Sequence, residues 1–187
     1  MTNLPAHIAI VFALTTLVTI FIFYKASRDS KTTLLIISVW LLLQSIIGLS
    51  GFYTITDTLP PRFLLLIGPP MALIVILFFT NWGKKYLDNL DARTLTLLHT
   101  IRVPVEVVLL WLSIHKMIPE LMTFEGTNFD ILSGLTAPFI YYFGFVKKRL
   151  SNKVIIAWNL ICLALLVNIV VSAILSAPTP FQKFAFD

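Results

Sequence analysis

The sequence alternates between long apolar blocks and short charged connections. The blocks are about 17 to 24 residues long, and a helix needs about 20 residues to cross roughly 30 Å of hydrocarbon. We expect six helices, at residues 6–24, 33–53, 62–82, 94–117, 131–146 and 154–177. The pattern predicts an all-α fold, a polytopic transmembrane helix bundle of about six spans that forms a single domain over residues 1–187.

Composition strengthens the membrane interpretation. Of the 187 residues, 58% are hydrophobic and 12% are charged, and the mean hydropathy is +0.91. Soluble domains carry about 25% charged residues, so a soluble fold of this size would lack polar surface. The natural partner is therefore membrane lipid.

The net charge of +5 does not point to a nucleic acid, because the basic residues lie in short connections beside apolar blocks. Ten of them fall in alternate connections: Lys25, Arg28, Lys31, Lys84, Lys85, Arg93, Lys147, Lys148, Arg149 and Lys153. The opposite side has Arg62, Lys116 and Lys183. The positive-inside rule then predicts that the ten lie in the cytoplasm and both termini outside, as in a multi-pass protein of the bacterial inner membrane.

Both ends of the chain allow expectations of their own. No basic residue precedes the first apolar block, so we expect a retained helix and not a cleaved signal peptide. The aromatic tail from residue 178 to residue 187 fits an interfacial segment. It also fits a fragment from which a further C-terminal helix is missing.

The fourth expected helix carries three titratable side chains on one face. His99, Arg102 and Glu106 are spaced i, i+3 and i+7. A charge near the bilayer centre costs at least about 2.5 to 3.5 kcal/mol on insertion scales, so we expect an Arg102–Glu106 ion pair that faces the bundle interior. Pro104 removes one helical hydrogen bond and predicts a kink and a cavity beside the pair. Two interpretations stay open: an ion pair that fixes helix register, or a proton relay or polar binding site.

Further polar positions are candidates to line the same cavity. Gln44 shares a helix face with Gly48 and Gly51, which would permit close helix approach, and Asn168 lies in the sixth helix. For Gln44 and Asn168 the simpler interpretation is an interhelical hydrogen bond. The adjacent prolines of residues 68–71 predict a broken or sharply bent third helix.

Cofactor and metal sites are not expected. Cys162 is the one cysteine, so neither a disulfide framework nor a cysteine metal cluster can form. Glu120, Glu125 and Asp130 in the outer loop match no metal signature and are typical of solvated acids. The histidines do not form opposed pairs that would suit haem.

Two runs carry a resemblance to a family. Residues 97–106 (LLHTIRVPVE) and 121–138 (LMTFEGTNFDILSGLTAP) are similar to those of a family of small, uncharacterised bacterial inner-membrane proteins with several spans. The resemblance implies that another apolar segment follows a tail of this kind. It supplies no activity.

Three functions remain in view. The first is the binding or transport of a small solute or proton in a polar cavity around Arg102 and Glu106, with His99 passing protons. The second is a non-catalytic accessory or scaffold protein whose loop at residues 125–130 meets a protein partner. The third is a lipid-modifying enzyme with Glu106 or His99 as general base, for which the sequence offers no convincing nucleophile.

Overall fold

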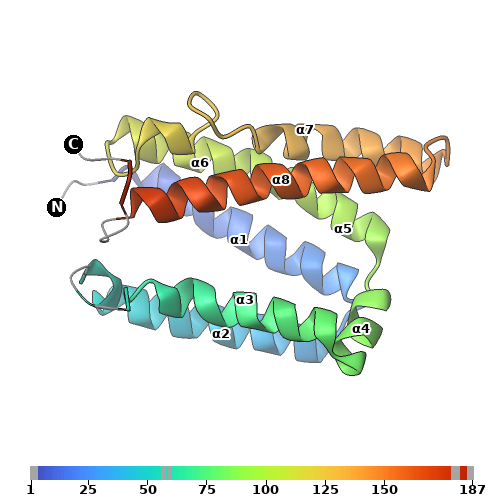
Figure 1. Ribbon diagram of the computed structural model, residues 1–187, viewed down its shortest axis with the longest axis horizontal. Coiled ribbons are helices and arrows are strands. Elements are labelled where there is room, and N and C mark those ends of the chain that lie inside the picture. The colour runs from blue at the N-terminus through green and yellow to red at the C-terminus, as the bar shows by residue number, and fades with distance from the viewer. Residues whose placement is uncertain (1–3, 56–57, 59, 178–181, 185–187) are drawn as a thin grey trace. The chain divides into compact units, whose positions relative to one another are not determined.

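The computed structural model describes residues 4–55, 58, 60–177 and 182–184. Within these residues the chain forms helices and no strands (Figure 1). They fall into two compact units: residues 4–23, 92–177 and 182–184 form the first, and the described residues of 24–91 form the second. The all-α prediction is therefore confirmed. The single-domain prediction stays a prediction.

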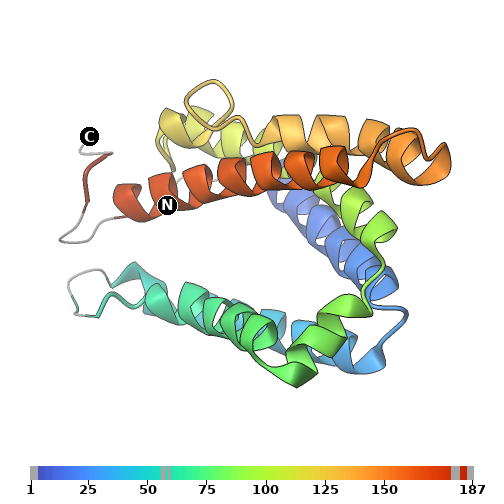
Figure 2. The ribbon, with the colours of Figure 1, turned by 45° about the vertical axis from the view of Figure 1, so that its right-hand side comes forward.

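The first unit holds most of the helices. Its elements are α1 (Ala6–Ala26, as far as residue 23), α5 (Ala92–Leu98), η2 (His99–Ile101), α6 (Arg102–Ile114), η3 (Glu120–Met122), α7 (Ile131–Ile140), η4 (Tyr141–Val146) and α8 (Asn152–Ser176). The α7 and α8 helices lie side by side, and α7 also packs on η2 (Figures 1 and 2).

The second unit is a helical hairpin with a bent end. Its elements are α2 (Lys31–Leu49), η1 (Phe52–Thr54), α3 (Leu64–Phe79) and α4 (Asn81–Asp88). Two hydroxyl caps start its helices: Ser30 Oγ accepts a hydrogen bond from the Thr33 amide, and Thr80 Oγ1 accepts one from the Gly83 amide. Figure 2 shows α3 turning into α4.

Four helices are long and apolar enough to cross a membrane: Ala6–Ala26, Lys31–Leu49, Ala92–Ile114 and Asn152–Ser176. The α3–α4 pair adds a fifth if it is counted as one span, although it bends by 92°. Residues Ile131–Val146 form a shorter apolar helix. All six expected segments are thus helical, with ends that differ by a few residues from the prediction.

The third helix is not broken at Pro69 and Pro70, because α3 runs through both prolines; the alternative of a bend at these residues stays a prediction. Proline leaves the carbonyl four residues earlier without its helical donor. Gln44 supplies a donor for one of these carbonyls, since its Nε2 donates to the carbonyl oxygen of Leu65 at 3.5 Å. The Tyr53 hydroxyl in turn donates to Gln44 Oε1.

The sharp bend lies further along the chain, at Thr80. Thr80 is extended and ends α3, and α4 then folds back tightly against it. A Cβ on Gly83 would lie 2.3 Å from Leu77 backbone atoms. Only glycine permits so close an approach.

The predicted glycine contact in α2 is also wrong. A Cβ on Gly48 would meet no described atom within 4 Å. Gly51 has a different role: its φ of +74° lies in the left-handed region that favours glycine, so it allows the chain to turn after α2.

The predicted aromatic tail, residues 178–187, lies largely outside the described residues.

Candidate functional site

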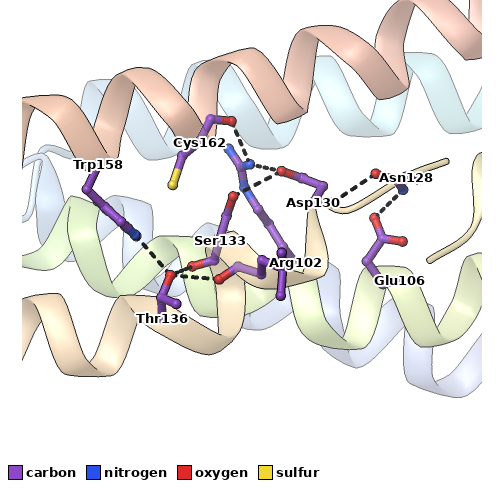
Figure 3. A network of polar contacts seen from close by, with 9 residues as sticks. Arg102, Glu106, Asn128, Asp130, Ser133, Thr136, Trp158 and Cys162 are labelled. Carbon is purple, nitrogen blue, oxygen red and sulfur yellow. Dashed lines mark hydrogen bonds and ion pairs between the residues drawn. The ribbon is translucent and has the colours of Figure 1, made fainter.

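The partner of Arg102 is Asp130, not Glu106. Arg102 Nη1 donates to Asp130 Oδ1 in an ion pair, and it also donates to the carbonyl oxygen of Cys162 at 3.2 Å (Figure 3). These contacts join α6, the start of α7 and α8. The expected Arg102–Glu106 pair is therefore wrong.

Asp130 is held by groups of its own segment. Its side chain is only 6% exposed, and Ser133 Oγ donates to Asp130 Oδ1 at 3.2 Å. The Asp130 amide donates to Asn128 Oδ1 at 3.1 Å. The expectation of a solvated loop acid is wrong for this residue, because it supplies the opposite charge for a largely buried guanidinium.

Glu106 contacts the same segment at a different point. It is 2% exposed, and its Oε1 accepts a hydrogen bond of 2.6 Å from Asn128 Nδ2. The same Asn128 nitrogen donates to the carbonyl oxygen of Met122 at 3.1 Å. Glu106 Oε2 is buried and has no hydrogen-bond partner among the described residues. Asn128 thus links Glu106 to the backbone that carries Asp130.

The length of α7 explains why these polar residues reach the interior. The α7 helix has 10 residues and continues directly into the six-residue π-helix η4, so residues 131–146 span roughly 24 Å, less than the roughly 30 Å of hydrocarbon. The connection before it folds inward, so that Thr123 is 0% and Asn128 is 1% exposed. The connection is therefore only partly an outer loop, and its exposed residues are His115, Lys116, Met117, Glu120, Glu125, Thr127 and Phe129.

Small residues let α7 approach the helix that carries Arg102. Ser133, Gly134 and Ala137 are buried on one face of α7. A Cβ on Gly134 would lie 2.8 Å from Val103 Cγ2 and 3.1 Å from the carbonyl oxygen of His99. Interfaces of this kind are typical of packed membrane helices.

The kink predicted at Pro104 stays a prediction, but the helix changes its hydrogen-bonding pattern just before this residue. The α-helical pattern of α5 changes to a single 3₁₀ turn at His99–Ile101 and resumes at Arg102. Pro104 cannot donate to the carbonyl of Thr100, which lies in that turn. The change of pitch falls between His99 and Arg102.

His99 lies beside an aromatic ring from α8. Its ring centroid is 4.8 Å from that of Trp158, and its Nδ1 is buried without a hydrogen-bond partner in the part of the chain that the structure describes. Trp158 Nε1 donates to Thr136 Oγ1 at 2.9 Å, which fixes the indole against α7 (Figure 3).

An open pocket of about 490 Å³ reaches this region. Its lining consists of His99, Arg102, Ile156, Asn159, Leu160 and Leu163. The Arg102 side chain is 18% exposed, whereas Glu106 does not line the pocket. The structure thus separates two features that the sequence led us to expect together: a pocket at Arg102 and a buried carboxyl at Glu106.

The other two predicted site residues lie elsewhere. Gln44 belongs to the second unit, where it donates a hydrogen bond to the α3 backbone. Asn168 belongs to α8 and donates from Nδ2 to the carbonyl oxygen of Thr127 at 3.0 Å. Neither lines the pocket, and both make the interhelical or loop hydrogen bonds of the simpler interpretation.

The two remaining histidines, His7 and His115, both contact Trp111. The His7 ring packs edge-on against Trp111 at 4.8 Å, and His115 Nδ1 lies 2.8 Å from the Trp111 carbonyl oxygen. Among the described residues, no three His, Cys, Asp or Glu side chains gather so that they could hold a metal ion.

Sequence reasoning missed Asn128, Asp130 and Ser133. One signal could have found them: the expected fifth helix, at residues 131–146, is too short to cross about 30 Å, and Asn128 and Asp130 directly precede it. A helix this short would begin within the hydrocarbon layer, so the polar residues directly before it are expected at the same depth.

Comparisons with models of protein families, with curated proteins and with solved structures find no match. The function is therefore inferred from the residues and their geometry.

Proposed function

We propose that this chain is a multi-pass protein of the bacterial inner membrane that binds or transports a small solute or a proton at the polar site around Arg102 and Glu106. One observation carries the proposal: an open pocket of about 490 Å³ reaches a partly exposed guanidinium inside an apolar span. Small-molecule sites have volumes of about 300–1,000 Å³. Ionisable residues within spans are functional candidates by default.

The proposed layout has six spans with both termini outside. Four helices and the bent α3–α4 pair have suitable length and composition. The sixth span is the short helix of residues 131–146, completed by the connection that folds inward before it. The ten basic residues of the alternate connections then lie in the cytoplasm.

Native mass spectrometry of the purified chain tests solute binding. The wild-type protein should retain a small-molecule adduct, and Leu163→Trp should lose it because the indole fills the pocket. Ile161→Trp is the matched control, since Ile161 is 60% exposed on the same helix and does not line the pocket. Equal spectra for both variants and the wild type would contradict a solute site here.

A second measurement tests the proton alternative, which is supported by Glu106 Oε2, a buried oxygen with no hydrogen-bond partner among the residues that the structure describes. In proteoliposomes with an entrapped pH dye, an imposed membrane potential should drive proton entry. Glu106→Gln keeps the acceptor for Asn128 and should abolish entry. If neither an adduct nor Glu106-dependent proton entry is found, the proposed function is wrong.

A scaffold function is the second candidate, and it is favoured because the polar side chains of the site pair with one another. Asp130 and Asn128 provide partners for Arg102 and Glu106 within the chain. Buried ion pairs can often be replaced by apolar residues without loss. Under this function Arg102→Met combined with Asp130→Leu leaves the protein's behaviour unchanged, and no adduct depends on Leu163.

A further inference from the structure

We infer that the pocket at His99 and Arg102 takes an uncharged, lipid-soluble molecule that presents a hydrogen-bond-accepting oxygen, such as the carbonyl of an ester. The inference rests on the proposed function, because it names the class of ligand for that same pocket. Three properties of the described residues lead to it: the pocket's apolar wall, its charge and its free donors.

The wall of the pocket is an apolar face of α8. Ile156, Leu160 and Leu163 follow one another at i, i+4 and i+7, so they share one helix face. They are 58%, 61% and 53% exposed. In a span that lies in a bilayer, exposed aliphatic side chains meet hydrocarbon. The pocket therefore opens toward lipid, and a ligand that dissolves in lipid can enter it.

The charge at the pocket is already balanced. Asp130 pairs with Arg102, so the two together carry no net charge. An anion bound to Arg102 would lie close to the Asp130 carboxylate. Repulsion between like charges is strong where the dielectric constant is low. A charged head group is therefore disfavoured, and an uncharged polar group is favoured.

The guanidinium still has donors to offer. An arginine has five N–H donors, and the hydrogen bonds of Arg102 to described residues all start at Nη1. Nε and Nη2 remain for a ligand, and the side chain is 18% exposed. Asn159 uses its Nδ2 on the carbonyl oxygen of Ile155. An acceptor oxygen on the ligand is thus complementary to Arg102.

The test uses three probes of equal chain length: a brominated stearic acid methyl ester, the brominated stearate anion and a brominated octadecane. Bromine quenches tryptophan fluorescence at short range. Trp158 contacts His99 at the pocket, so Trp40, Trp82 and Trp111 are replaced by Phe to leave it as the sole reporter. The ester should quench saturably and bind about tenfold tighter than the alkane, which lacks an acceptor for Arg102.

Matched variants assign the effect to the pocket. Leu163→Phe should weaken the binding of all three probes, whereas Ile161→Phe should change none. Arg102→Met with Asp130→Leu removes the donors without leaving a lone charge, and it should abolish the preference for the ester. If that protein does not fold, Arg102→Lys keeps the charge and loses the planar fork of donors, so the preference should fall.

Each outcome decides the inference. Tighter binding of the anion overturns the uncharged ligand class and leaves a pocket that binds solutes. Equal binding of ester and alkane overturns recognition by Arg102. If no probe quenches saturably, the inference is wrong, and the mass spectra of wild type and Leu163→Trp then decide separately whether the proposed function fails as well.

Discussion

At the scale of residues, the chain places two acidic side chains and one arginine inside an apolar bundle by giving each a specific partner. Arg102 is paired with Asp130, and Glu106 accepts from Asn128. Both partners come from one short stretch, residues 128–130, which belongs to the connection before α7 and packs against α6. Burying a polar group is tolerable when such hydrogen bonds are made and costly when they are not.

Asn128→Leu tests the role of the amide. It removes the donor to Glu106 and to the carbonyl oxygen of Met122, so we expect a loss of about 1–3 kcal/mol in the free energy of unfolding. Unfolding in mixed micelles, followed by circular dichroism, measures it. Glu125→Ala is the control, since Glu125 is exposed in the same connection, and it should change the free energy by less than about 0.5 kcal/mol. Equal losses for the two variants would contradict this role.

At the scale of elements, a short helix and a short 3₁₀ turn shape the site. The short helix formed by α7 and η4 begins directly after the buried Asn128 and Asp130, and the 3₁₀ turn at His99–Ile101 directly precedes Arg102. The apolar blocks allowed the helices to be predicted, and Pro104 indicated the region in which the helical pattern changes. The Arg102 partner was misassigned because spacing along one helix reveals only neighbours on that helix, and Asp130 lies 28 residues away in sequence.

Gly134→Ala tests the close approach of α7 to η2. The new methyl group would lie 2.8 Å from Val103 Cγ2 and 3.0 Å from the Val103 amide nitrogen, so the helices must separate. We expect a loss of about 1–3 kcal/mol in the free energy of unfolding. Gly48→Ala is the control, because that position is open, and alanine should stabilise α2 by about 0.5–1 kcal/mol. A stabilising Gly134→Ala would show that the helices are not in close contact.

At the scale of the whole molecule, composition and block length sufficed to predict a helical chain with helices suited to a membrane. The two prolines of α3 could not be interpreted correctly, because the group that assists their backbone, Gln44, lies on another helix. The bend at Thr80 depends on a glycine whose need appears only after the chain has folded back. Contacts between one helix and another decided both of these cases.

Labelling of introduced cysteines tests the proposed orientation. In a Cys162→Ala background, Arg62→Cys and Glu125→Cys should react with a membrane-impermeant maleimide added to intact spheroplasts. Lys85→Cys and Lys148→Cys should react only after permeabilisation, because the positive-inside rule places them in the cytoplasm. The reverse pattern would invert the topology, and a mixed pattern would change the number of spans.

A double-mutant cycle on the arginine tests the central claim most directly, namely that the site is organised by Arg102 and Asp130. Asp130→Leu alone should cost up to about 3–5 kcal/mol of unfolding free energy, and adding Arg102→Met should restore most of it, because a largely buried charge without its partner is worse than none. The corresponding cycle with Glu106→Leu should give a much smaller coupling. A large coupling between Arg102 and Glu106, with none between Arg102 and Asp130, would contradict the account.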